Sequence, residues 1–168
     1  KLSSGTRISS AADAAADLAI SEKMRAHVKS AHAAQRNTQD GISMLNVLDG
    51  ALGEVTQKVS RLRELAVQSA SEVLADSERE YISIEYRDLI RDIDRVTGSA
   101  DFNGLDLLSG GNTTVSVQVG ISESGVENRV RVRLRSVNAN TLGLDVTRVD
   151  SAADAQNALK RLDGAIDI

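Results

Sequence analysis

The stretch from Leu45 to Ala66 reads LNVLDGALGEVTQKVSRLRELA. Its apolar residues recur at alternating spacings of three and four, which is the heptad stripe of a helix that packs against other helices. The stripe consists of Leu45, Leu48, Leu52, Val55, Val59, Leu62 and Ala66. A stripe held this long predicts a helix with one continuous apolar face.

The helical pattern continues upstream of this stretch. Ile20, Met24, Val28 and Ala31 keep the spacing, and Ser9 or Ser10 would serve as the N-cap, with Asp13 near the positive helix end. We therefore predict one helix over 11–70, on the order of 90 Å long at 1.5 Å per residue.

Two further helices follow. After a connection around 71–77, a second stripe runs to Gly98, a natural stop. A third helix begins near Ser151, where Ser151 and Asp154 have the spacing of a capping box. The residues of these two stripes are Ile82, Tyr86, Leu89, Ile93 and Val96, then Ala155, Leu159, Leu162 and Ile166.

Between these helices the apolar period changes to two. Residues 115–121 and 130–134 alternate apolar and polar side chains around a turn at 122–125, which predicts a β-hairpin. The segment Asp101-Phe-Asn-Gly104 is a turn and lacks the ligand pattern of a calcium loop.

The predicted fold is therefore mostly α with a small β region: an elongated bundle of long helices with heptad-like, coiled-coil stripes plus a β-hairpin. We expect one structural domain overall, with the long and second helices in 1–112, the hairpin region in 113–149 and the start of the last helix in 150–168. The absence of Pro and Trp, with 2% aromatic residues, suits long helices and an aliphatic core.

Composition excludes several kinds of chemistry. The chain has no Cys, and its two histidines, His27 and His32, are five residues apart, which does not stack them as metal ligands on one helix face. We expect no cofactor, no metal and no enzymatic activity. A net charge of −4 argues against nucleic acid as a partner, and no apolar run is long enough for a membrane span.

One charged pattern stands out. Arg129, Arg131, Arg133 and Arg135 alternate with apolar residues along the second hairpin strand. This row is either a binder of anionic surfaces or the solvated face of an edge strand, where charge discourages aggregation. We favour the second interpretation.

Several separate motifs occur in a defined order along nearly the whole chain. They are Leu2-Ser-Ser-Gly5, Ser10-Ala-Ala-Asp13, Asp40-Gly-Ile-Ser43, Arg63-Glu-Leu-Ala-Val-Gln-Ser-Ala70, Ile93-Asp-Arg-Val96, Phe102-Asn-Gly104 and Thr141-Leu-Gly-Leu-Asp145. In these motifs the sequence resembles bacterial flagellin. At 13–17 the family usually has Asp-Asp-Ala-Ala-Gly, so Ala14 and Asp17 depart from its pattern.

The resemblance implies a structural subunit of the flagellar filament, which self-assembles into a helical propeller for motility. The chain would be the inner core layer of flagellin, called D1, with the terminal D0 helices missing at both ends. Its implied partners are other flagellin subunits in a homopolymer and an export chaperone that acts through the missing C-terminus. The implied location is extracellular, in the flagellum, after secretion through the flagellar export apparatus.

The resemblance also implies recognition by the flagellin-sensing Toll-like receptor of vertebrates, and hence a part in innate immune recognition. Its contacts would fall on Arg61, Leu65 and Glu85. We expect these three side chains to share an exposed ridge of the first two helices, where they would form a binding hot spot.

Two other function classes remain. A hook–filament junction protein or a surface adhesin of the same helical family would share the long helices. An enzyme would need a catalytic insertion, and the sequence contains none between its motifs.

Overall fold

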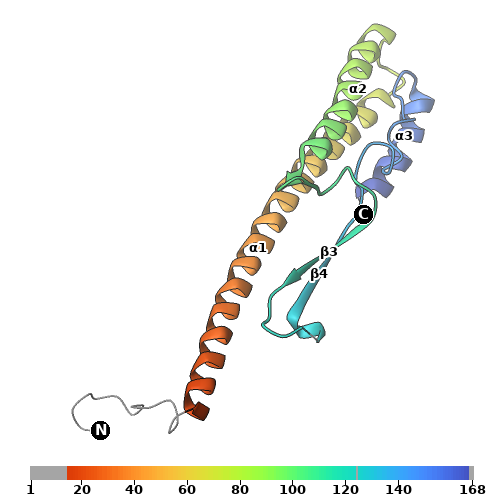
Figure 1. Ribbon diagram of the computed structural model, residues 1–168. Coiled ribbons are helices and arrows are strands. Elements are labelled where there is room, and N and C mark those ends of the chain that lie inside the picture. Colours follow the sequence, from red (N-terminus) through yellow and green to blue (C-terminus); the bar gives the residue numbers. More distant parts are fainter. Residues whose placement is uncertain (1–14, 124, 167–168) are drawn as a thin grey trace. The chain divides into compact units, whose positions relative to one another are not determined.

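A computed structural model describes residues 15–123 and 125–166. The chain is mostly α with a small β region, as predicted (Figure 1). Its elements are α1 (Ala15–Ser69), α2 (Asp76–Ser99), β1 (Asp101–Phe102), β2 (Leu105–Asp106), β3 (Thr113–Gln118), the 3-10 turn η1 (Val126–Asn128), β4 (Arg129–Leu134) and α3 (Ala152–Ile166).

Helix α1 confirms the prediction of a single long helix over the described residues. The predicted cap at Ser9 or Ser10, residues 11–14 and the unusual Ala14 lie outside the described residues. Asp17, the second unusual residue, is exposed in the first turn of α1. A carboxylate there is favourable because it faces the positive end of the helix dipole.

The predicted stop of the second helix at Gly98 was wrong. Gly98 does not stop the helix: α2 ends at Ser99, and Ala100 is its C-cap. The φ angle of Gly98 is not positive, so this residue does not adopt the left-handed conformation that makes glycine a helix stop.

The N-terminus of α3 confirms the predicted cap. The Ser151 hydroxyl oxygen accepts a hydrogen bond from the Asp154 amide at 3.1 Å, and α3 begins at Ala152. The Ser151 hydroxyl also donates to the Asp154 carboxylate at 2.6 Å. The bond from the Asp154 amide to the Ser151 hydroxyl is one half of a capping box, and the bond between the two side chains holds the Asp154 carboxylate beside it.

The contacts divide the chain into two compact units. We call residues 43–115 and 132–168 the second unit. Its core joins the later half of α1 to α2, α3 and the connection between β4 and α3, and its most buried side chains include Leu62, Tyr86, Ile93, Leu144 and Leu162. A smaller cluster around Met44, Leu107, Leu108 and Leu134 extends this apolar packing.

The first unit consists of residues 1–42 and 116–131. Here small residues of α1 let the hairpin approach closely. A Cβ atom at Gly41 would lie 3.3 Å from a methyl group of Val117, and the Asn37 amide donates to the Gln118 carbonyl at 3.1 Å. Ala34 is the single buried apolar residue in the described part of this unit.

The turn predicted at 101–104 is confirmed and belongs to a second, minimal hairpin. Strands β1 and β2 pair antiparallel, with Phe102 opposite Leu105. Asn103 and Gly104 both have positive φ, at 53° and 77°. In two-residue hairpin loops, an Asn-Gly pair with positive φ at both residues gives a turn whose twist matches that of the flanking strands.

Strands β3 and β4 form the predicted larger hairpin. None of the described helices is both long and apolar enough to cross a membrane. The division into 1–112, 113–149 and 150–168 within one structural domain stays a prediction.

Candidate functional site

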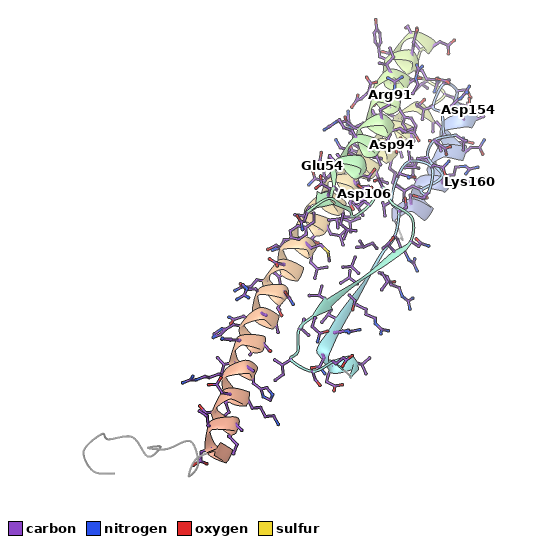
Figure 2. All side chains as sticks on the ribbon, in the orientation of Figure 1. Glu54, Arg91, Asp94, Asp106, Asp154 and Lys160 are labelled. Atoms are coloured by element: carbon purple, nitrogen blue, oxygen red, sulfur yellow. The ribbon has the colours of Figure 1, made fainter. Side chains whose placement is uncertain are left out.

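Helices α1 and α2 of the second unit are joined by ion pairs along one side, which we call the ion-paired ridge. It consists of Lys58 and Arg61 on α1 with Glu85 and Asp92 on α2. Arg61 Nη2 lies 2.8 Å from Glu85 Oε1, and Lys58 Nζ lies 3.0 Å from Asp92 Oδ2. Glu54 on α1 and Arg91 and Asp94 on α2 belong to the same helix pair (Figure 2).

Arg61 is shared between two carboxylates. Besides Glu85, it contacts Glu64 one turn along α1, with Nη1 at 2.9 Å from Oε2. The hydrogen bond to Glu64, followed by the one to Glu85, raises the pKa of Arg61 above its ordinary value. About half of the Arg61 and Glu85 side chains is exposed (47% and 48%), so the pair is available to a partner and adds little to folding stability.

The neighbouring pair is more protected. The Lys58 side chain is only 15% exposed and also lies 3.6 Å from Glu54. Hydrogen bonds from Lys58 and then from Arg95 lower the pKa of the Asp92 carboxyl below its ordinary value. These pairs link α1 to α2 at two points one helical turn apart on α1.

The expected exposure of Leu65 is wrong. Arg61 and Glu85 are exposed and in contact, but Leu65 is only 1% exposed and belongs to the apolar core of the second unit. It lies one turn beyond Arg61, on the buried side of α1 that also carries Leu62. The structure therefore brings together two of the three predicted residues at the surface and places the third beneath it.

A buried arginine, which the sequence analysis did not single out, organises the end of α1. Arg79 is 6% exposed. Its Nη1 donates to the Ser69 carbonyl, and its Nη2 donates to the carbonyls of Ser71 and Leu74 at 3.3 Å each. The guanidinium thus satisfies carbonyls at the negative end of the α1 dipole and in the turn that follows.

Two hydroxyl groups tie the connection before α3 to this helix pair. Ser69 Oγ donates to the Val149 carbonyl at 2.6 Å. The buried Tyr86 hydroxyl donates to Thr147 Oγ1 at 2.9 Å, and burial raises the pKa of Tyr86. The carbonyl of Leu144 accepts from Thr147 in turn, at 2.5 Å.

The described residues contain no cluster of three or more His, Cys, Asp or Glu that could hold a metal ion. His27 and His32 are both exposed on α1. The arrangement suits recognition by charged and apolar faces, and its buried polar groups bond one helix or connection to the next. These features define a mostly helical protein with charged and apolar helix faces.

Comparison with known proteins identifies the family to which this helical protein is similar. The family model of the bacterial flagellin N-terminal helical region matches residues 1–113. The chain is 38% identical over 178 residues to a flagellar filament 30.7 kDa core protein of Treponema maltophilum, covering 99% of this chain and 62% of that protein. It is 40% identical over 157 residues to a phase 2 flagellin of Salmonella typhimurium, covering 94% of this chain and 30% of that protein.

A solved structure agrees. The crystal structure of Bacillus cereus flagellin is similar with a TM-score of 0.66 at 28% sequence identity, covering 79% of this chain and 76% of that one. The chain belongs to the bacterial flagellin family. It spans less than two thirds of the length of the Treponema and Salmonella relatives.

Proposed function

We propose that the protein is a structural subunit of the bacterial flagellar filament and that it works by self-assembly rather than by catalysis. Family membership is the observation that carries this proposal. Its principal partners would be other flagellin subunits, with which it would form a homopolymer. The resulting filament would act as a helical propeller outside the cell.

The surface of the first unit supports an assembling role. Leu18, Ile20, Met24 and Val28 of α1 are 48% to 63% exposed. Exposed apolar side chains gathered on one helix mark an interaction surface in soluble proteins. A subunit that repeats one contact between unlike surfaces forms an open helical filament when the rotation between neighbours does not close into a ring.

Electron microscopy of the complete product of the gene tests this proposal. The purified protein is brought to polymerising conditions beside the phase 2 flagellin of Salmonella typhimurium as the positive control. We expect filaments from both. Filaments from the control alone would contradict the proposal and favour the hook–filament junction or adhesin alternatives.

We also propose that the flagellin-sensing Toll-like receptor recognises this protein through Arg61 and Glu85, with Leu65 supporting Arg61 from the core. Both side chains are exposed, and Arg61 is preorganised by its hydrogen bonds to Glu85 and Glu64. The two residues lie on two helices that a buried core holds together. A preorganised charged pair costs less side-chain entropy on binding than two free side chains.

The matched test compares two double variants. Arg61→Ala with Glu85→Ala removes the proposed contact, whereas Lys58→Ala with Asp92→Ala removes the neighbouring ion pair of the same helices. Loss of a hot spot of about 2 kcal/mol would weaken receptor binding roughly 30-fold for the first variant only. Equal affinity of both variants and the unchanged protein would remove Arg61 and Glu85 from the interface.

Secretion through the flagellar export apparatus and binding to an export chaperone complete the proposal. Their support is the family alone. Disruption of the export apparatus should leave the protein inside the cell, measured by immunoblot of cells and medium. Undiminished secretion would contradict this route.

A further inference from the structure

Strand β4 carries an arginine row on one of its faces. Arg129, Arg131 and Arg133 alternate along the strand, and Arg135 follows directly after it. Side chains two residues apart lie on the same face of a strand. All four arginines are exposed, so the row concentrates positive charge in a chain whose net charge is −4.

The row is not neutralised by the described part of the protein. Among residues 15–123 and 125–166, no carboxylate forms an ion pair with any of the four arginines. Arg129 is held by a hydrogen bond from its Nε to Gln118 Oε1 at 2.8 Å. Like charges close together on one strand face repel each other, and an anionic partner would remove that cost.

A surface of opposite charge lies where α1 ends and α2 begins, and we call it the acidic turn. It comprises Glu72, Asp76, Glu78 and Glu80, all exposed where α1 ends and α2 begins. The arginine of this segment, Arg79, points inward to backbone carbonyls. No described Lys or Arg forms an ion pair with any of the four carboxylates.

We propose that the acidic turn of one copy docks against the arginine row of a second copy. Arginine and carboxylate groups match in geometry, because the guanidinium can donate two parallel hydrogen bonds. The two surfaces differ, so the contact is heterologous and each copy can bind one neighbour at each surface. This contact rests on the proposed filament function and names the surfaces that a homopolymer would use.

The test exchanges the charges of the two surfaces in the complete gene product. Arg131→Glu with Arg133→Glu reverses the row and leaves the Arg129 hydrogen bond in place. Glu72→Arg with Glu80→Arg reverses the acidic turn and leaves Glu78, whose carboxylate accepts from the Ala75 amide. A fourth protein carries all four substitutions and has the same net charge as the unchanged protein.

The readout is the critical concentration for polymerisation, measured by sedimentation and electron microscopy, with circular dichroism as a check on folding. Each reversal alone should raise the critical concentration about tenfold or more, which corresponds to about 1.4 kcal/mol. The combined protein should return toward the unchanged value. Higher salt should narrow the difference between the unchanged protein and the single reversals, because the Debye length, about 8 Å at physiological ionic strength, shortens as salt is added.

The outcomes separate this contact from the proposed function. Polymerisation of the unchanged protein together with normal polymerisation by both folded reversal variants would overturn the contact and leave the filament function standing. A combined protein no better than the single reversals would overturn it too, and would favour an edge-protecting role for the row. Failure of the unchanged protein to polymerise would overturn both proposals.

Discussion

The two units place the same helix in opposite environments. In the second unit, α1 buries Val55, Val59, Leu62 and Ala66 against α2 and α3, whereas the described part of the first unit leaves Met24 63% exposed. Among the described residues, every buried apolar side chain other than Ala34 belongs to the second unit. The stability of the chain therefore resides in the second unit, whereas large apolar side chains of the first unit stay exposed.

The largest difference should appear when a large apolar side chain is truncated in each unit. Leu62→Ala removes a fully buried side chain and should cost about 2–5 kcal/mol of unfolding free energy. Met24→Ala in the first unit should change it by less than about 0.5 kcal/mol. Denaturant unfolding of both variants measures the contrast, and equal losses would contradict the assignment of stability to the second unit.

A smaller loss is expected for the buried arginine of the second unit. Arg79→Leu leaves the carbonyls of Ser69, Ser71 and Leu74 without their donor and should cost about 2–3 kcal/mol. Arg91→Leu is the matched control, because Arg91 is exposed and pairs only with Asp88 on its own helix. If the two substitutions cost the same, Arg79 does not hold the α1–α2 turn.

The buried Tyr86 should make the stability of the second unit depend on pH. Its raised pKa means that the unfolded chain ionises first, so stability is lost as pH rises above the ordinary tyrosine value of 10.0. Tyr86→Phe should cost about 1 kcal/mol at neutral pH, from the lost bond to Thr147. The variant should also lose stability less steeply above pH 10 in chemical denaturation, and parallel pH profiles would refute the role of Tyr86.

The smallest effects concern two helix glycines, one in each unit. A Cβ at Gly50 would meet nothing within 4 Å, so Gly50→Ala should stabilise the chain by up to about 1 kcal/mol through helix propensity. At Gly41 the new methyl would press on Val117 at 3.3 Å and offset that gain. Thermal unfolding should show a rise in Tm for Gly50→Ala alone. A larger rise for Gly41→Ala would mean that the hairpin does not pack closely there.

The helices could be predicted because their apolar period is local information. The stripe from Leu45 to Ala66 placed α1, and the spacing of Ser151 and Asp154 placed the start of α3. The strands of the minimal hairpin at Phe102 and Leu105 were missed, because strands of two residues are too short to show a period.

Burial was harder to predict, because it depends on which elements lie opposite. Leu65 was expected on the exposed ridge because the family resemblance implies a receptor contact there, although a Leu three residues after Leu62 could equally face the core. Arg79 stands among acidic residues, a pattern typical of a solvated face, and its burial follows from the position of the α1 carbonyls. The family resemblance placed Arg61 and Glu85 on one ridge, but their ion pair was not predicted, since 24 residues separate them in sequence.

Native-state hydrogen exchange along α1 tests the central claim most directly, because both environments lie on one helix. In the unassembled 168-residue chain, amides in 55–66 should exchange only through near-global unfolding. Amides in 17–33 should open with a free energy lower by roughly 3 kcal/mol or more. Uniform protection along the whole helix would contradict the claim that stability resides in the second unit.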